Sequence, residues 1–122
     1  MGKRILAVDD SASVRQMQRF VLSGAGYEVI DAIDGKDGLS KLEKNGAVNL
    51  ILTDLNMPNL DGVGFIKAVR ASSAHRLTPI VVISTESQQE KKQEARAAGA
   101  TGWIVKPFTP EQLLAVVKKV IG

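Results

Sequence analysis

Four short apolar runs, each ended by polar residues, divide this chain and restrict the folds that it can adopt. The runs are three or four residues long, and each is followed by a segment with the residue spacing of a helix. Apolar runs this short are typical of strands that are buried on both faces of a parallel sheet. The polar residues that end them are Asp9-Asp10, Asp54, Ser84 and Lys106.

Strands and helices alternate five times along the sequence, which predicts a doubly wound α/β domain with helices on both faces of one sheet. We expect strands at 5–8, 27–32, 50–54, 80–83 and 102–105. We expect helices at 12–23, at 35–45, from 62 through 69, from 88 and from 111.

The helix from residue 88 is unusual because 88–94 contains no apolar residue. Only Ala95 and Ala98 can then face the sheet. We expect this helix to be weakly docked, which favours motion or contact with a partner.

Length, charge and residue usage exclude several classes of protein. The 122 residues are enough for one domain with one continuous core, and no apolar stretch is long enough to span a bilayer. The absence of cysteine excludes disulfides and thiolate chemistry. Sixteen basic against 13 acidic residues give a net charge of +3, which no segment concentrates, so we expect no nucleic-acid partner. With no export signal, we expect the chain in the cytoplasm.

Three carboxylates follow two of the predicted strands. The ligand crevice of an open α/β sheet lies at the carboxyl ends of its strands, so Asp9, Asp10 and Asp54 should converge there. Each pair about 5 Å apart would repel by roughly 3 kcal/mol at an effective dielectric of 20. This arrangement favours a hard divalent cation, and Mg²⁺ suits it best. Each aspartate alone is more often a cap or turn residue, but their coincidence favours a site.

Ser84 and Lys106 add groups that a metal site alone does not need. An ammonium and a hydroxyl suit phosphate oxygens, which predicts a phosphoryl group beside the cation. Asp54 is the best nucleophile candidate, since carboxylates form acyl phosphates in phosphoryl transfer. His75, the only histidine, is expected to be a plain surface residue. No glycine-rich nucleotide loop follows any strand, so we do not expect bound ATP.

Over its whole length the chain resembles the receiver domains of two-component response regulators. The resemblance implies a flavodoxin-like fold with strand order 2-1-3-4-5, and a single receiver domain over 1–122 without an output domain. The motifs that carry it are Val8-Asp9-Asp10-Ser11, Asp54-Leu55-Asn56-Met57-Pro58, Asp61-Gly62, and Ala98-Gly99-Ala100 through Lys106-Pro107-Phe108.

The resemblance implies that Asp54 accepts a phosphoryl group from the phosphohistidine of a histidine kinase. It further implies that Mg²⁺ or Mn²⁺ is held by Asp10, Asp54 and the main-chain carbonyl of Asn56, with Asp9 assisting through water. The chain would then catalyse only its own phosphorylation and dephosphorylation, and we expect no turnover of a free substrate.

The same resemblance implies a switch. Lys106 would pair with the acyl phosphate, Ser84 would swing to hydrogen-bond it, and Trp103 would move inward in response. Two residues depart from the usual pattern, because the family more often has Thr at position 84 and Tyr or Phe at position 103.

A receiver without an output domain must act by binding another protein, as the single-domain chemotaxis regulators of the CheY type do. Asn56 and Glu86, which lie two positions beyond the phosphoacceptor and the switch serine, match the pair found in these regulators. Thr85 and Glu86 are expected to modulate the site. The implied target is a flagellar motor switch protein, bound by the fourth helix, fifth strand and last helix. We expect this face to be basic and to suit an acidic segment, because it carries Lys91, Lys92, Arg96, Lys118 and Lys119.

Three other functions fit parts of this pattern. A single-domain phosphorelay carrier needs the same site, and the sequence does not separate it from a motor regulator. A metal-dependent phosphatase with an aspartyl nucleophile usually has an Asp-x-Asp pair, whereas this chain has Asn56 two residues after Asp54. A flavin carrier would need a phosphate loop after the first strand, where Asp9 and Asp10 would repel phosphate.

Overall fold

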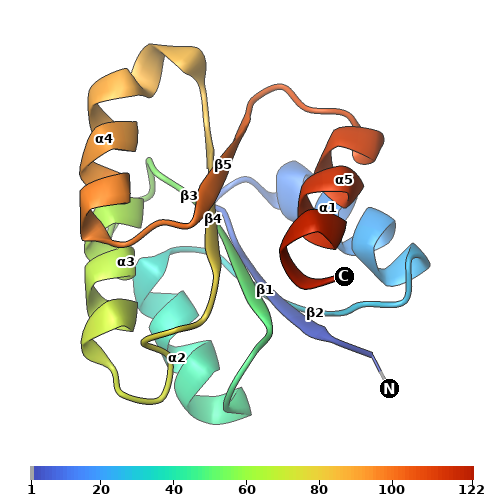
Figure 1. Cartoon of the computed structure of the whole chain (residues 1–122), viewed down its shortest axis with the longest axis horizontal. Coiled ribbons are helices and arrows are strands. Elements are labelled where there is room, and N and C mark those ends of the chain that lie inside the picture. Colours follow the sequence, from blue (N-terminus) through green and yellow to red (C-terminus); the bar gives the residue numbers. More distant parts are fainter. Residues whose placement is uncertain (1) are drawn as a thin grey trace.

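The computed structural model describes residues 2–122, apart from the side chain of Glu86, and contains one five-stranded sheet. All neighbouring strands are parallel and lie in the order β2-β1-β3-β4-β5, which confirms the predicted order (Figure 1). The strands are β1 (Arg4–Val8), β2 (Glu28–Ala32), β3 (Leu50–Asp54), β4 (Ile80–Ser84) and β5 (Gly102–Val105).

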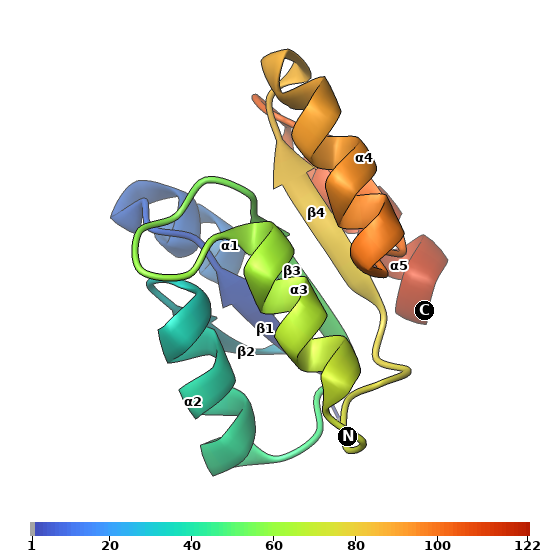
Figure 2. The same ribbon diagram turned by 90° about the vertical axis from the view of Figure 1, so that its left-hand side faces the viewer.

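Helices cover both faces of the sheet, as the alternating pattern predicts (Figures 1 and 2). One face is covered by α1 (Ala12–Gly24) and α5 (Pro110–Ile121), and the other by α2 (Gly35–Asn45), α3 (Gly62–Ala71) and α4 (Gln89–Ala98). A short 3₁₀ turn, Glu86–Gln88, precedes α4. Four helix starts are fixed by side chains that accept a main-chain N–H of the first turn: Ser11, Asp34, Asp61 and Thr109.

The sheet separates two hydrophobic cores. Side chains of β1, β3 and β4 alternate between them, which explains why these strands are apolar along their whole length. Phe65 of α3 is fully buried on one side, and Leu113 of α5 is fully buried on the other. None of the described helices is long and apolar enough to cross a membrane.

Two sequence-based expectations are wrong. The first turns of α4 are anchored, because Lys92 is only 8% exposed and its Nζ lies 4.9 Å from the centre of the Trp103 ring. A lysine stem can cover apolar surface while its charge stays near water. His75 is also buried rather than exposed, because the chain after α3 folds back over the ends of α2 and α3. In this turn its main-chain N–H donates to Ser72.

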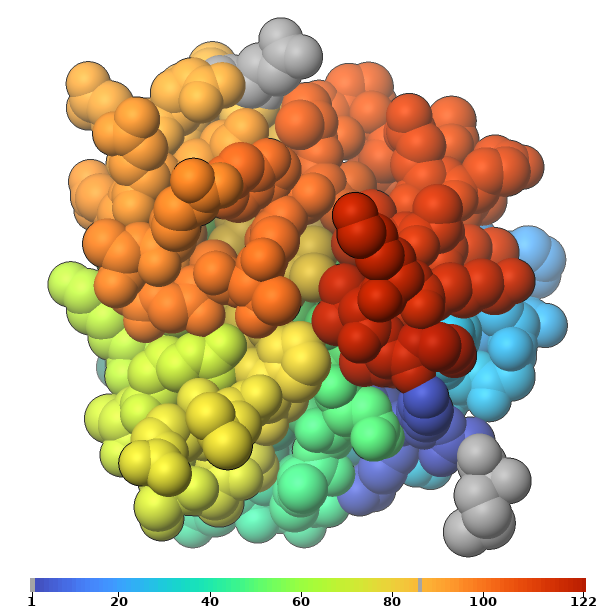
Figure 3. Space-filling model, in the orientation of Figure 1, coloured from blue at the N-terminus to red at the C-terminus, as the bar shows by residue number. Residues whose placement is uncertain are grey.

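The elements α4, β5 and α5 share one face of the molecule. The space-filling view shows α4 and β5 in orange beside α5 in red (Figure 3). A pocket of about 690 Å³ lies between β5 and α5 and is lined by residues such as Ile104, Lys106 and Gln112.

Candidate functional site

Three carboxylates meet at the carboxyl end of the sheet. β1 and β3 are neighbours, and their register pairs Val8 with Thr53. The next residues, Asp9 just after β1 and Asp54 at the end of β3, therefore lie at the same level. Oxygen atoms of Asp9, Asp10 and Asp54 all lie within 4.8 Å of one another. Asp9 and Asp54 are buried and Asp10 is exposed, so the cluster opens to solvent on the Asp10 side.

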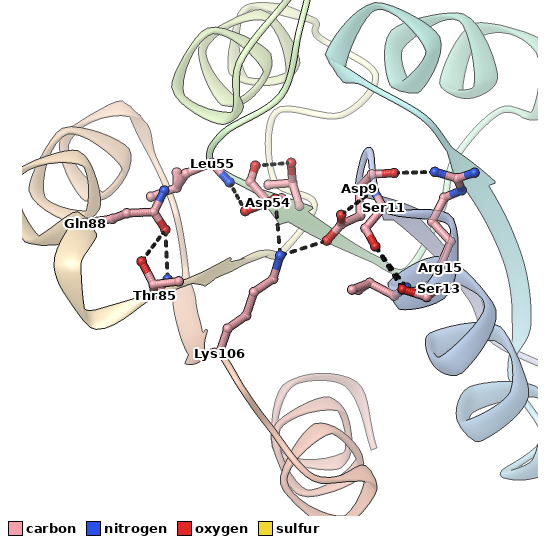
Figure 4. A network of polar contacts seen from close by, with 11 residues as sticks. Asp9, Ser11, Ser13, Arg15, Asp54, Leu55, Thr85, Gln88 and Lys106 are labelled. Atoms are coloured by element: carbon pink, nitrogen blue, oxygen red, sulfur yellow. Dashed lines mark hydrogen bonds and ion pairs between the residues drawn. The ribbon is translucent and has the colours of Figure 1, made fainter.

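Lys106 bridges the two buried carboxylates. Its Nζ lies 3.2 Å from an oxygen of Asp9 and 3.2 Å from an oxygen of Asp54, and Figure 4 shows it pointing between them. Burial acts to lower the pKa of Lys106, but the two carboxylates outweigh this effect and the pKa is raised. Lys106 therefore stays protonated, and its charge is directed at Asp54.

Asp54 occupies an environment that disfavours its charge. Burial raises the pKa of Asp54 above its usual value, and the Asp9 carboxylate raises it further, against the opposing effect of Lys106. One carboxylate oxygen accepts a hydrogen bond from the main-chain N–H of Leu55 at 2.8 Å, and the other faces Lys106. A cation bound beside Asp54 would relieve the repulsion from Asp9.

Ser84 lies at the end of β4 next to this cluster. It is fully buried, and its hydroxyl has no hydrogen-bond partner among the described residues. The main-chain carbonyl of Ser84 accepts a hydrogen bond from the N–H of Lys106 at 2.7 Å, so the two residues are coupled through the backbone. A buried hydroxyl without a protein partner is uncommon in folded proteins.

A profile of the response regulator receiver domain family matches residues 5–118. The chain belongs to this family. It is 38% identical over 120 residues to chemotaxis protein CheY1 of Helicobacter pylori, covering 98% of this chain and 97% of the relative. It is 49% identical to chemotaxis response regulator CheY4 of Vibrio cholerae, whose structure superimposes with a TM-score of 0.93 over 98% of this chain and 99% of the other.

A third relative carries a metal. It is the receiver domain of a sensor histidine kinase from Pseudomonas aeruginosa, solved with a magnesium ion coordinated in its active site cleft. The present chain is 27% identical to that domain, and the two structures superimpose with a TM-score of 0.91 over 100% of this chain and 99% of the other. The family and fold expected from the sequence motifs are thus confirmed.

The donor set of this receiver domain fits a hard divalent cation. Three carboxylates supply oxygen ligands, and the exposed Asp10 leaves one side of the cluster accessible. Asn56, whose main-chain carbonyl is the fourth expected ligand, is exposed in the loop between β3 and α3.

Two further predicted residues, Thr85 and Trp103, lie after β4 and on β5. Thr85 is exposed, and its main-chain N–H donates to the side chain of Gln88 at 2.8 Å (Figure 4). Trp103 is half-buried on β5, beneath the cations of Lys92 and Arg96. The side chain of Glu86 lies outside the described residues.

Sequence reasoning missed the residues that shape the loop carrying Asn56. Asp34, the cap of α2, accepts a hydrogen bond from the side-chain amide of Asn59 at 2.6 Å, and Asn59 adopts a positive φ of 68°. A side chain at Gly62 would place its Cβ 2.3 Å from the main-chain oxygen of Asp54, so only glycine lets α3 begin this close to the strand. The Asp61-Gly62 motif was the sequence signal for this contact, whereas the Asp34–Asn59 pair spans 25 residues and has none.

Proposed function

We propose that this receiver domain is a phospho-accepting switch. An oxygen of Asp54 attacks the phosphorus of a kinase phosphohistidine, an acyl phosphate forms, and the bond from phosphorus to the imidazole nitrogen breaks. The observation that carries this proposal is the position of Asp54, at a strand end and 3.2 Å from the Lys106 ammonium.

Each neighbouring residue has a defined role in this proposal. Asp10, Asp54 and the main-chain carbonyl of Asn56 would hold Mg²⁺ or Mn²⁺, with Asp9 acting through water. When bound, the cation supplies positive charge that offsets the carboxylates and the phosphoryl oxygens. Lys106 is already directed at Asp54 and would pair with a phosphoryl oxygen. The partnerless Ser84 hydroxyl would donate to another phosphoryl oxygen.

The output of the switch would be a change in affinity for a target protein. The CheY relatives support a role in chemotaxis. The target that we propose is a flagellar motor switch protein. We assign the contact to the face made by α4, β5 and α5, where the exposed Arg96, Lys118 and Lys119 suit an acidic segment. Lys92, which the sequence predicts to add to this charge, is buried. In this proposal the chain acts as a single domain, and it turns over no free substrate.

The phosphoacceptor can be tested with Asp54→Asn, which keeps the size of the side chain and removes the nucleophile. Wild type incubated with acetyl phosphate and Mg²⁺ should gain one base-labile phosphoryl group, measured by mass spectrometry, and the variant none. Equal labelling of both proteins would overturn the assignment.

The cation site can be tested by thermal unfolding. Free Mg²⁺ at ten times its dissociation constant should stabilise the fold by about 1.4 kcal/mol, because it binds only the assembled site. Asp10→Ala should lose most of this gain and nearly all phosphorylation. A rise in melting temperature equal to that of wild type would place the metal elsewhere.

The target can be identified by affinity capture with and without beryllofluoride, a phosphoryl mimic on aspartate. A motor switch protein retained only with beryllofluoride supports the proposed output. Rapid transfer of the Asp54 phosphoryl group back to a histidine phosphotransfer protein would instead indicate a phosphorelay carrier.

A further inference from the structure

The main chain at the end of β1 is held at several points. The N–H of Asp9 donates to the carbonyl of Ala32 at 3.1 Å, and one Asp9 carboxylate oxygen accepts the N–H of Ser11 at 2.9 Å. The main-chain carbonyl of Asp9 accepts a hydrogen bond from Nη1 of Arg15 at 2.7 Å. Figure 4 shows Arg15 reaching from α1 to this carbonyl.

Asp10 has no comparable support of its own. Its side chain is exposed and forms no hydrogen bond or ion pair with any part of the chain that the structure describes. The carbonyl of Asp9 and the N–H of Asp10 belong to one planar peptide unit. The hydrogen bond from Arg15 therefore fixes the orientation of the backbone from which the Asp10 carboxylate extends.

Arg15 is itself held in place. Its side chain is 17% exposed, and its Nε lies 3.6 Å from a carboxylate oxygen of Asp31 at the edge of the sheet. The other oxygen of Asp31 binds Arg19 at 2.9 Å. Arg15 and Arg19 thus share Asp31, but of these two arginines only Arg15 donates a hydrogen bond to Asp9 in the part of the chain that the structure describes.

We propose that Arg15 is a positioning residue for the cation site. By holding the Asp9 carbonyl, it directs the Asp10 carboxylate toward Asp9 and Asp54 and so raises the affinity for the divalent cation. The inference rests on the proposed function, because it assigns Arg15 to the same site. Groups that orient metal ligands typically change metal affinity by about 10- to 100-fold when they are removed.

The charge of Arg15 and its geometric role predict opposite results. Replacing Arg15 with Met removes a positive charge near the carboxylates, and by electrostatics alone this would strengthen binding of a cation. Loss of positioning would weaken it. A weaker Mg²⁺ affinity in Arg15→Met therefore cannot arise from the charge.

The experiment compares Arg15→Met, Arg15→Lys and the matched control Arg19→Met in the full chain. Titration calorimetry measures the Mg²⁺ dissociation constant, and urea unfolding in EDTA measures stability without metal. We expect Arg15→Met to weaken Mg²⁺ binding about 10-fold or more. The Mg²⁺ dissociation constant of Arg19→Met should stay within about twofold of the wild-type value, although this variant also loses an ion pair with Asp31. Arg15→Lys should recover part of the affinity, because its ammonium can donate to the same carbonyl.

Three outcomes separate this inference from the proposed function. Wild-type affinity in Arg15→Met, or an equal loss in Arg19→Met, would overturn the positioning role and leave the proposed function standing. Wild type that binds no Mg²⁺, or binds it equally well after Asp10→Ala, would overturn the proposed cation site itself. Weaker Mg²⁺ binding in Arg15→Met, without a comparable loss in Arg19→Met, supports the inference.

Discussion

A few buried polar side chains of this domain have atoms without a hydrogen-bond partner among the described residues. Within the described residues these groups are the Ser84 hydroxyl, both amide atoms of Gln18 and Nδ1 of His75. Leaving a buried polar group unpaired typically costs about 1–3 kcal/mol. Ser84 lies beside the proposed phosphoacceptor, where an incoming phosphoryl group would supply the missing partner. Gln18 faces inward from α1 and is fully buried, and the proposed function makes no use of it.

Gln18→Leu should therefore stabilise the domain. The leucine has a similar size and buries no unpaired amide, so the free energy of unfolding should rise by about 1–2 kcal/mol. Urea unfolding measures the change. Gln16→Leu, at an exposed position of the same helix, should change stability by less than about 0.5 kcal/mol. A fall in stability for Gln18→Leu would show that the amide has a partner such as buried water.

Asp54→Asn should stabilise the metal-free domain at neutral pH. The pKa of Asp54 is raised in the fold from 3.8, by burial first and then by Asp9. The folded chain thus binds this proton more tightly than the unfolded chain. The free energy of unfolding of wild type should fall as the pH rises from about 4 through the folded-state pKa. The variant should lack this fall, as measured by urea unfolding in EDTA.

Asp34→Asn serves as a control of opposite sign. Hydrogen bonds from the Asp37 N–H and the Asn59 amide lower the pKa of Asp34 in the fold. Its contribution to stability is present above pH 3.8 and is lost as the pH falls through the folded-state pKa. In Asp34→Asn, the free energy of unfolding should therefore depend less on pH under acidic conditions than it does in wild type. Identical profiles for the two variants would contradict both assignments.

The helix α4 is anchored to the fold through its buried side chains. Its two buried residues are Lys92 and Ala95, and Lys92 and Arg96 both lie over the Trp103 ring, at 4.9 and 4.3 Å. Cation–π contacts of this kind contribute about 0.5–2 kcal/mol each. If Trp103 moves inward, as the family resemblance implies, its motion would have to break these two contacts or move Lys92 and Arg96 with it.

Lys92→Ala should loosen this arrangement. Loss of the stem and the charge should lower the free energy of unfolding by about 1–2 kcal/mol and increase quenching of the Trp103 emission by acrylamide. The matched control is the neighbouring Lys91→Ala, since Lys91 lies 3.9 Å from Asp61 instead. Lys92→Met retains the stem, so its free energy of unfolding and its acrylamide quenching should lie between those of Lys92→Ala and Lys91→Ala. Equal quenching in all the variants would show that Lys92 does not shield Trp103.

Across the whole molecule, one side chain joins several segments at the end opposite the site. The guanidinium of Arg70 on α3 donates to the carbonyl of Thr78 at 2.7 Å and to that of Gly99 at 2.9 and 3.1 Å. It thus joins the turn before β4 to the end of α4. Gly99 has a φ of 121°, a backbone conformation that favours glycine, and the Arg70 side chain packs against it.

Arg70→Met should lower the free energy of unfolding by about 2–3 kcal/mol, because several carbonyls lose their donor together. Phosphorylation of Asp54 by acetyl phosphate should stay within about twofold of wild type under conditions in which the variant is folded, because Arg70 lies at the other end of the sheet. Urea unfolding and phosphorylation kinetics measure the two effects. Arg76→Met, at an exposed position, should change neither the free energy of unfolding nor the phosphorylation rate. A large loss of phosphorylation rate in Arg70→Met would show that the two ends are coupled.

The sequence predicts the elements and the convergence of Asp9, Asp10 and Asp54, because local patterns fix where each strand ends. It does not predict how Lys92 or His75 are buried. A lysine stem packs against whichever surface lies nearby, and the burial of His75 depends on how the 72–78 turn folds back. The sequence also does not predict the hydrogen bond from Arg15 to the Asp9 carbonyl, because every residue has a main-chain carbonyl. Such contacts follow from tertiary proximity rather than residue type.

The ion pairs of Lys106 join distant parts of the chain. Ninety-seven residues separate this lysine from Asp9, and 52 separate it from Asp54. During synthesis on the ribosome both carboxylates emerge long before their common counter-charge. The last strand must leave the exit tunnel before the ammonium can reach them. A nascent chain or a proteolytic fragment that stops before residue 106 therefore carries the acidic cluster without the lysine that pairs with it.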